Sequence, residues 1–357
     1  MRVNFKGWPA TAAVGLTLLL ALLSAGLSGC EGGGDGGAMP AGAHAGSGPA
    51  RVTAHAGVNL YPAAHPAIFM PGVAGELDVQ RIGFDPGRIL TDFDYGRVSY
   101  LPGGRRVREY WVTAGLKNVE IVPGIVYEAW TYNGRVPGPT FRAVEGDLLR
   151  IHFRNATAHP HSMHFHTVHP ANMDGVYEPV AAGGEFLYEL DAEPFGVHPY
   201  HCHIMPLASH ISRGLYGAII IDPKAGRPKA DQEMVMVMAG NDIDFDNEND
   251  FYNVNFIPFW YDRHPIKIKK DALVRIYLLN LLEFDQSNSF HIHANFFDYY
   301  PTGTSLKPSE FTDTVAQMQA QRGIVEFRYR HPGRFMFHGH KTEFAELGWT
   351  GVFEVEE

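Results

Sequence analysis

The stretch that decides the fold runs from residue 184 to residue 203 and reads GEFLYELDAEPFGVHPYHCH. It holds two short runs of aromatic and β-branched residues, separated by Asp, Pro and Gly, and it ends on a cysteine between two histidines. A third run, GAIIID at 217–222, follows closely. Short runs of this kind, broken by turn residues, predict β-strands. They recur from about residue 105 with few helical patterns, which predicts an all-β protein built from sandwich domains.

The same order of segments occurs twice. The first copy reads GDLLRIHFRN (146–155), HPHSMHFH (159–166), the stretch 184–203 and GLYGAIIID (214–222). The second copy reads KDALVRIYLLN (270–280), SNSFHIH (287–293), GIVEFRYRHPGRFMFHGH (323–340) and LGWTGVFEV (347–355). An internal repeat of this length indicates two similar domains in tandem. We expect domain 1 at 105–225, domain 2 at 226–357, and an N-terminal extension at 51–104.

Composition excludes several classes of protein. The chain has 357 residues, of which 45% are hydrophobic, so it is long and apolar enough for two domains with real cores. A formal net charge of −10 argues against a nucleic-acid binder, which must neutralise phosphates. The two cysteines, Cys30 and Cys202, are too few for a disulfide framework or for Cys-rich zinc or iron–sulfur sites. The unusual number is the 19 histidines.

The N-terminus has the pattern of an export signal. Arg2 and Lys6 precede an apolar run at 10–27, which predicts a signal peptide, although the run approaches the length of a membrane anchor. The residues LSGC at 27–30 resemble the bacterial lipoprotein box. We therefore expect a lipoprotein signal peptide at 1–29, lipidation at Cys30 and a flexible Gly/Ala-rich tether at 30–50. The protein would be exported and held by its lipid alone on the periplasmic or cell-surface side of a membrane, and Glu31 favours the outer membrane.

The histidines are concentrated in His-x-His pairs. Chance predicts about one such pair in this chain. Five occur, at 159/161, 164/166, 201/203, 291/293 and 338/340. Residues two apart on a strand point to the same face, so each pair presents two imidazoles in one direction. Several converging pairs predict a polynuclear metal site, whereas the isolated His152 and His331 are interpreted as ordinary core residues.

Only the first copy adds a thiolate to the imidazoles. His161, Cys202 and His210 together give one thiolate and two imidazoles in a β-sandwich, which is the ligand set of a blue-copper site. The second copy has Asn288 and Gly339 at the matching positions, and neither supplies such a ligand. The other four pairs provide eight imidazoles for a second kind of site.

With these motifs the sequence resembles the two-domain multicopper oxidases (small laccases) whose type 1 copper lies in the N-terminal domain only. The resemblance covers about 105–355 and includes YNGRVPGPTFRAVEGD at 132–147, the HFH, HCH, HIH and HGH pairs, and ELGWTGVFEV at 346–355. It implies two cupredoxin-like Greek-key sandwiches and four coppers per chain. Type 1 copper would be held by His161, Cys202 and His210, type 2 copper by His164 and His291, and the type 3 pair by His166, His201, His203, His293, His338 and His340.

The resemblance also implies an activity and an assembly. The enzyme would couple one-electron oxidation of a phenol, a metal ion or a redox partner protein to the four-electron reduction of O2 to water, with the metals carrying the chemistry. A homotrimer would bring domain 1 of one subunit against domain 2 of the next, with a copper cluster at each interface. The alternative is a copper-containing nitrite reductase, which shares the domains and the type 1 site but needs only three histidines for its type 2 copper. A simple electron carrier would leave the histidine pairs of domain 2 without a purpose.

Two assignments stay open in the sequence. Leu215, five residues after His210, occupies the usual axial position of the type 1 copper, and Met205 is its rival; a leucine there would raise the reduction potential. Asp174, in HFHTVHPANMDG, is the candidate proton relay for O2 reduction, although it also suits an ordinary turn before a glycine. Glu343 is a second candidate for the relay, and His169 is interpreted as a surface residue of the same loop as Asp174.

Overall fold

The computed structural model describes residues 77–357. The expected signal peptide, the lipidation site Cys30, the tether and residues 51–76 lie outside the described residues. Among the helices that are described, none has the length and apolar character needed to cross a membrane.

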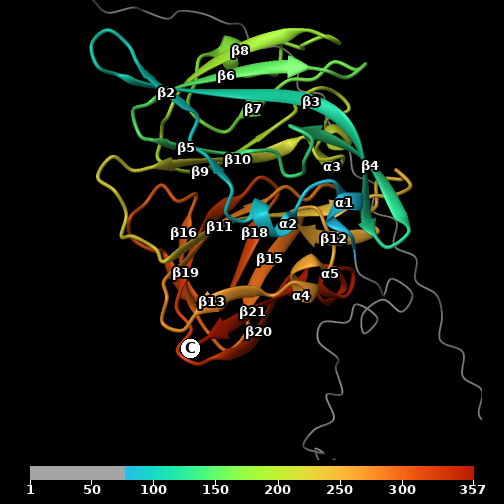
Figure 1. Cartoon of the computed structure of the whole chain (residues 1–357), viewed down its shortest axis with the longest axis vertical. Helices are drawn as coiled ribbons and strands as arrows, with labels where there is room; N and C mark the ends of the chain where they lie inside the picture. Colours follow the sequence, from blue (N-terminus) through green and yellow to red (C-terminus); the bar gives the residue numbers. More distant parts are fainter. Residues whose placement is uncertain (1–76) are drawn as a thin grey trace, which may run out of the picture. The chain divides into compact units, whose positions relative to one another are not determined.

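Domain 1 is a sandwich of two sheets, drawn in cyan, green and yellow in Figure 1. One sheet has the order β2-β3-β6-β8, with β4 also paired to β3, and the other has the order β1-β5-β10-β9-β7. The strands are β1 (Phe93–Asp94), β2 (Arg97–Tyr100), β3 (Arg106–Val122), β4 (Ile125–Tyr132), β5 (Thr140–Val144), β6 (Leu148–Asn155), β7 (His164–Phe165), β8 (Glu185–Asp191), β9 (Gly196–His201) and β10 (Tyr216–Asp222). Two short helical segments, η2 (Ala171–Met173) and α3 (Leu207–Ser212), lie in its loops.

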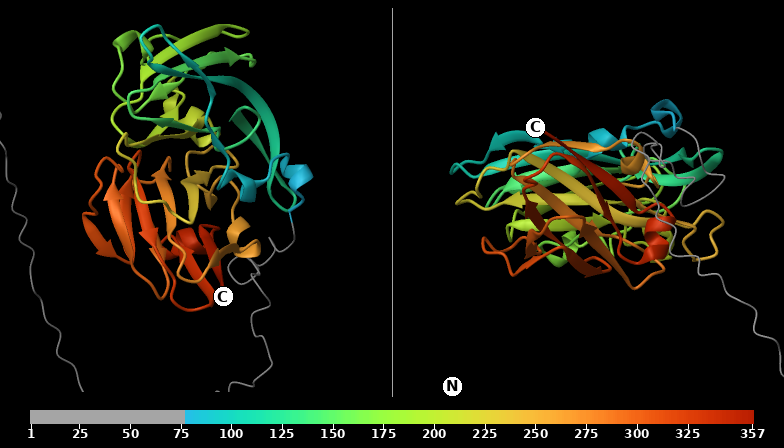
Figure 2. Two further views of the ribbon diagram at one scale, coloured as in Figure 1. Left: turned by 60° about the vertical axis from the view of Figure 1, so that its left-hand side comes forward. Right: turned by 90° about the horizontal axis from the view of Figure 1, so that it is seen from below.

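Domain 2 is a second sandwich, drawn in orange and red in the two further views of Figure 2. Its sheets have the orders β12-β11-β14-β19-β16-β17 and β13-β21-β20-β15-β18. The strands are β11 (Gln232–Asn241), β12 (Phe251–Val254), β13 (Ile266–Lys269), β14 (Val274–Asn280), β15 (Ser287–Ile292), β16 (Phe297–Pro301), β17 (Glu310–Thr312), β18 (Thr314–Met318), β19 (Arg322–Phe327), β20 (Gly333–His338) and β21 (Thr350–Glu356). The short helices α4 (Trp260–Arg263) and α5 (Thr342–Glu346) complete it.

The repeat seen in the sequence is a repeat of strand pairing. β3 pairs in parallel with β6 as β11 does with β14, and β5 pairs in parallel with β10 as β13 does with β21. The pairs that carry histidines also match, because His164 lies opposite His201 and His291 lies opposite His338. The structure therefore confirms the expected all-β fold, in which one arrangement of strands occurs twice.

Alternation of apolar and polar residues explains why these strands form sandwiches. In β6, Leu149, Ile151 and Phe153 are fully buried, while the residues between them lie on the outer face. A strand with this period buries one face in the core and leaves the other in solvent. β14 is buried along its whole length, as expected for a strand covered on both faces.

Residues 77–104, the described part of the expected extension, are built into the sandwiches. β1 pairs in parallel with β5, and β2 pairs antiparallel with β3. The helices α1 (Val79–Ile82) and α2 (Pro86–Ile89) precede them. α1 contacts β3, and α2 touches domain 2, where the hydroxyl of Tyr261 donates to the carbonyl of Pro86. Short strands that complete two sheets are hard to find by pattern, because their side chains are largely exposed.

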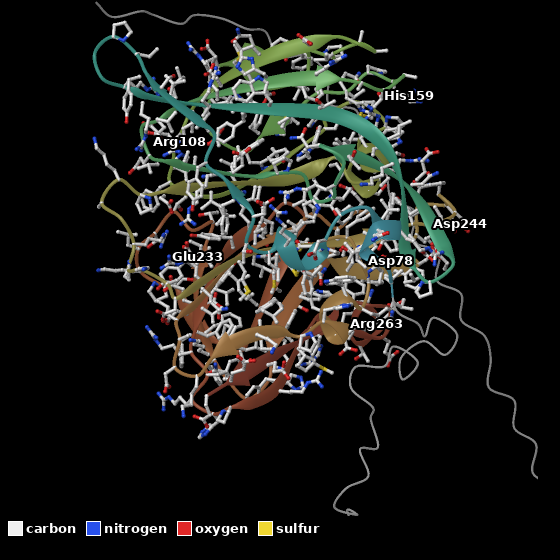
Figure 3. The ribbon with its side chains drawn as sticks, viewed as in Figure 1. Asp78, Arg108, His159, Glu233, Asp244 and Arg263 are labelled. Carbon is white, nitrogen blue, oxygen red and sulfur yellow. The ribbon has the colours of Figure 1, made fainter. Side chains whose placement is uncertain are left out.

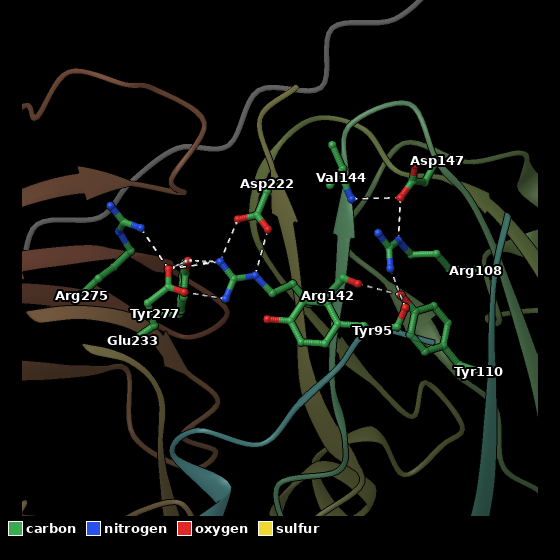
Figure 4. A network of polar contacts seen from close by, with 10 residues as sticks. All are labelled: Tyr95, Arg108, Tyr110, Arg142, Val144, Asp147, Asp222, Glu233, Arg275 and Tyr277. Atoms are coloured by element: carbon green, nitrogen blue, oxygen red, sulfur yellow. Dashed lines mark hydrogen bonds and ion pairs between the residues drawn. The ribbon is translucent and has the colours of Figure 1, made fainter. Parts of the chain in front are cut away.

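A partly buried ionic network joins the two domains (Figure 4). The guanidinium of Arg142 in β5 binds the carboxylate of Asp222 at 2.8 Å and that of Glu233 at 2.7 Å, so it links domain 1 to the first strand of domain 2. Glu233 also accepts hydrogen bonds from Arg275 at 2.9 Å and from the Tyr277 hydroxyl at 2.8 Å. Burial alone raises the pKa of Glu233, but the hydrogen bonds and charge of Arg142 outweigh it and bring this pKa to about 2.

Replacing Glu233 with glutamine is expected to lower the free energy of unfolding at pH 7 by about 2–3 kcal/mol, because it leaves Arg142 and Arg275 without their shared carboxylate. The folded-state pKa lies below the unfolded value of about 4.3, so the carboxylate stabilises the fold above about pH 4.5 and this contribution is lost as pH falls toward 2. Thermal unfolding of metal-free wild type and Glu233→Gln should therefore differ at pH 7, differ less as pH falls below about 4.5, and converge only near pH 2. The exposed pair Lys267–Glu356 offers a control, Glu356→Gln, expected to leave the midpoint unchanged. An equal effect of the two substitutions at pH 7 would contradict the prediction.

Candidate metal centres

The structure brings the expected type 1 ligands together inside domain 1. His161 follows β6 in a loop, Cys202 comes directly after β9, and His210 lies on α3. The Cys202 Sγ lies 3.1 Å from His210 Nδ1 and 3.8 Å from His161 Nδ1, and the two Nδ1 atoms are 3.2 Å apart. All three side chains are buried. One sulfur and two nitrogens thus face a common point, as the sequence predicts.

The chemistry of these donors fits a copper ion. Burial, together with the neighbouring His210, lowers the pKa of His161 to about 3, and burial lowers that of His210 to about 4. Both rings are therefore neutral, which is the form that binds a metal. Burial also raises the pKa of the Cys202 thiol, so the protein alone does not favour the thiolate there. A metal cation at the common point would supply that stabilisation.

The two candidates for the axial position differ in burial. Leu215 is fully buried in the same core cluster as Cys202, and its carbonyl accepts the Cys202 N–H at 2.9 Å. Met205 is 77% exposed. The structure therefore places Leu215, and not Met205, beside the type 1 ligands.

A second group of histidines gathers at one end of domain 1. The His166 and His201 Nε2 atoms are 3.1 Å apart, and the His164 ring lies 5.1 Å from that of His203. The Nδ1 of His164 contacts the carbonyl of Asp174 at 2.9 Å, and the Nδ1 of His201 contacts that of Cys202 at 2.9 Å. Backbone carbonyls that engage Nδ1 fix the ring so that Nε2 is the free nitrogen for a metal.

Domain 2 repeats this arrangement with its own four histidines. The His293 and His338 Nε2 atoms are 3.0 Å apart, and the His291 ring lies 4.9 Å from that of His340. The Nδ1 of His291 contacts the carbonyl of Asp313 at 3.0 Å, and the Nδ1 of His338 contacts that of the following glycine at 2.8 Å. Each domain therefore gathers four imidazoles, and the same two positions of each set have Nδ1 against a backbone carbonyl. Within residues 77–357, no group of mutually close ligand atoms combines histidines of the two domains.

Burial favours the neutral form of several of these rings. It lowers the pKa of His166 to about 3, with a further contribution from His201, and that of His201 to about 4. The pKa values of His293 and His338 are lowered by burial as well, and these two are less enclosed. At this distance the two rings can share a hydrogen bond or hold one cation between them, and sets of neutral imidazoles are ligands that copper accepts, so both sets fit copper.

The loop after β7 places a carboxylate against one of these ligands. Asp174 Oδ1 lies 3.0 Å from His164 Nδ1 and 3.5 Å from His169 Nε2. His169, which we interpreted as a surface residue, is in fact folded inward, with its Nε2 also 3.0 Å from the Phe165 carbonyl. The sequence held one signal of this position, because His169 follows His166 by only three residues in HFHTVHP. Glu343 instead lies near the surface and pairs with Lys341 at 3.1 Å.

Sequence reasoning also missed a buried support, His198 in β9. Its Nδ1 contacts the carbonyl of His166 at 3.0 Å and its Nε2 contacts that of Pro194 at 2.8 Å. The His198 ring therefore bridges two backbone segments, one at His166 and one at Pro194, next to the domain 1 histidines. The interpretation of His152 and His331 as core residues was wrong: His152 lies on the outward phase of β6 and stacks on Trp111 at 5.0 Å, and His331 is exposed in the turn after β19.

Domain 2 keeps the backbone of a type 1 site without its ligands. Leu215 and His210 are joined by a backbone hydrogen bond of 3.2 Å, and Trp349 and Phe344 by an equivalent one of 2.8 Å. In the repeat, Asn288 stands at the position of His161 and Gly339 at that of Cys202. Phe344 stands at the position of His210, and Trp349 at that of Leu215.

The Trp349 indole fills the place of the missing site. Its Nε1 donates to the Asn288 side-chain oxygen at 2.9 Å. A Cβ added to Gly339 would lie 2.5 Å from the Trp349 ring, so a cysteine cannot return there without moving the indole. Among residues 77–357, the group of one cysteine and two histidines therefore occurs in domain 1 and has no counterpart in domain 2.

Known proteins resemble the chain over both domains. Multicopper oxidase family models match residues 114–226 and 228–357. A multicopper oxidase of known structure is 58% identical, with a TM-score of 0.78, and covers 79% of this chain and 100% of its own. The copper nitrite reductase structure from Nitrosomonas europaea is 28% identical with a TM-score of 0.66, covering 70% and 94% of the two chains.

A curated relative gives a similar picture. The copper-containing nitrite reductase of Neisseria meningitidis is 28% identical over 265 residues, which are 67% of this chain and 67% of that protein. The family models cover both sandwiches, and the paired histidines of the sequence motifs meet in space in each of them, joined in domain 1 by a separate group that contains Cys202. The chain belongs to the multicopper oxidase family, and it is accordingly a copper oxidoreductase.

Proposed function

We propose that this protein is a two-domain oxidase that takes single electrons from a reducing substrate and delivers four of them to O2, forming water. The observation that carries the proposal is the pair of matching four-histidine sets, His164/His166/His201/His203 and His291/His293/His338/His340, beside a separate site of one cysteine and two histidines. Four coppers per chain, one type 1, one type 2 and two type 3, are the number these donors can hold. Eight imidazoles exceed the needs of the single type 2 copper of a nitrite reductase.

The chain connects the two kinds of site covalently. Cys202 lies between His201 and His203, so its thiolate and two imidazoles of the second site share consecutive residues. The His201 Nδ1 contact to the Cys202 carbonyl, at 2.9 Å, adds a shorter route between them. Bound copper would supply the electron storage and O2 chemistry that side chains lack. The residues themselves supply the path, the ligand orientation and the exclusion of water from the type 1 ligands.

Asp174 holds the His164 ring through its backbone carbonyl, 2.9 Å from Nδ1, and through its carboxylate, 3.0 Å from the same atom. The side chain is partly exposed and also reaches His169. We propose that this carboxylate passes protons from solvent toward the histidine sets, in addition to fixing the ring. His169 is the next group on that route.

The same proposal includes a homotrimer, because each four-histidine set needs a second set facing it to form a copper cluster. Beside His291 and His293 lies an open cavity of about 890 Å³. Its rim includes Phe296 and Phe311, which are exposed and pack against each other with ring centroids 5.4 Å apart. Exposed aromatic pairs next to an incomplete metal set favour contact with another subunit. Head-to-tail contacts of this kind close into a ring.

Export and anchoring remain part of the proposal. The expected lipoprotein signal peptide and lipidation at Cys30 would hold the oxidase on the outer side of a membrane, where small reductants and redox proteins reach it. The reducing substrate would be a phenol, a metal ion or such a partner protein.

Copper content and electron acceptor test the proposal together. Protein lacking residues 1–30, loaded with copper and desalted, is expected to hold about four coppers per chain and to consume O2 with a phenolic donor, because the donor sets above match that number. About two coppers per chain, with nitrite reduced and O2 untouched, would support the nitrite reductase alternative instead. Native mass measurement on the same sample is expected to give a trimer, and a fully active monomer would contradict that part.

A further inference from the structure

Neither histidine of the type 1 site reaches solvent. His161 is fully buried and His210 is 3% exposed. The ring of Trp130, at the end of β4, stands edge-on to both, with centroids 5.2 Å from His161 and 4.7 Å from His210. On the outer side, the exposed His159 stacks on Trp130 at 5.8 Å. A donor approaching from solvent on this side therefore meets Trp130 or His159 before it meets a ligand.

Trp130 is held by a stack that crosses between the domains. The Arg213 guanidinium lies 5.0 Å from the Trp130 ring and 3.8 Å from that of Phe245. The backbone N–H of Trp130 also donates to the Arg213 carbonyl at 2.8 Å. Phe245 belongs to the loop between β11 and β12 of domain 2, next to Asp244, which Figure 3 labels together with His159.

The physical properties of the stack suit electron transfer. A guanidinium between two aromatic faces is attracted to both rings and fixes their positions. Trp130 thus stays nearly perpendicular to the His210 ring, and the residue is partly exposed. The second contact, to Phe245, makes the geometry at the type 1 site of domain 1 depend on a side chain of domain 2.

We propose that Trp130 is the residue through which electrons reach the type 1 site, and that Arg213, clamped by Phe245, is its positioning residue. The proposal rests on the proposed function only for the presence of a type 1 copper. In the step, a phenol at this surface loses one electron, which crosses the indole to the His210–Cys202 ligand set. The phenolic proton leaves to solvent, no bond to the protein forms, and the type 1 site is reduced by one electron.

Anaerobic stopped-flow reduction of the copper-loaded protein by 2,6-dimethoxyphenol tests this step directly. Trp130→Leu is expected to slow bleaching of the blue absorbance at least about tenfold, with copper content and the type 1 reduction potential unchanged. The matched control is Trp111→Leu, because Trp111 also stacks on a histidine in domain 1 but lies away from the ligands. The blue absorbance of Trp111→Leu is expected to bleach at the wild-type rate. Bleaching of Trp130→Leu at the wild-type rate, or a slowing fully explained by a changed potential, would overturn the proposal.

A second variant keeps the test decisive if Trp130→Leu fails to bind copper. Phe245→Ala removes only the outer ring of the stack, from a partly exposed loop of the other domain. It is expected to slow the bleaching several-fold with an intact blue spectrum, and an unchanged rate would overturn the clamping role. The experiment uses no O2, and its readout is the blue absorbance of the type 1 site alone. Its failure would therefore leave the oxidase function standing, and a loss of O2 reduction would leave this inference standing.

Discussion

Cys202→Ser is expected to abolish the blue colour and to reduce oxidase turnover on the order of 1,000-fold, to background. The serine hydroxyl cannot replace a thiolate as a soft ligand, and it also interrupts the shortest covalent path between the two kinds of site. His161 and His210 would remain, but two buried neutral imidazoles alone do not retain the metal against desalting. Copper content is therefore expected to fall from about four to about three per chain, as the histidine sets keep theirs.

The measurements are the visible spectrum, copper per chain and O2 uptake with a phenolic donor. Met205→Leu is the control, because Met205 lies three residues away but is exposed and outside the site. It is expected to match wild type in all three. A Cys202→Ser protein that stays blue would show that the type 1 site is elsewhere. A fall from about two coppers to about one would instead favour the nitrite reductase alternative.

The ligands could be predicted from the sequence because strand geometry and covalent order do most of the positioning. β9 ends at His201, so His203 lies just beyond the strand, but with only one residue between them the two rings still lie 5.9 Å apart. Cys202 and His210 are only eight residues apart, and the short helix α3 closes that distance. These short-range relations are visible in the sequence, and the structure preserves them.

What the sequence could not show depends on contacts between distant segments. Trp130 and Arg213 are 83 residues apart, and Phe245 comes from the other domain, so no local pattern joins them. Trp349 fills the place of a type 1 site in domain 2 through its contact with Asn288, which also lies far from it in the sequence. Strands β1 and β2 escaped notice because their burial pattern is weak and their partners lie far along the chain. His169 was misplaced because a loop histidine has no periodicity that reports its direction.

The division of the histidines between two domains leads to a prediction about mixed assemblies. His166→Ala removes one imidazole from the domain 1 set, and His293→Ala removes its counterpart from the domain 2 set. If each cluster forms between domain 1 of one subunit and domain 2 of the next, either variant alone spoils every cluster, and each is expected to be inactive. In a mixed trimer, however, an intact cluster forms wherever domain 1 comes from the His293→Ala chain and domain 2 from the His166→Ala chain.

When equal amounts of the two variants assemble at random, about a quarter of the interfaces join domain 1 of a His293→Ala chain to domain 2 of a His166→Ala chain. About a quarter of wild-type O2 uptake is therefore expected to return. Each restored cluster draws on the type 1 site of the His293→Ala subunit, whose Cys202 and flanking histidines are untouched. A mixture of His166→Ala with His201→Ala, both in domain 1, is the matched control and is expected to stay inactive. Mixed trimers that contain both chains by native mass spectrometry yet recover nothing would contradict shared clusters. Recovery would mean that neither four-histidine set is a complete site alone, and that the O2-reducing site forms only when subunits assemble.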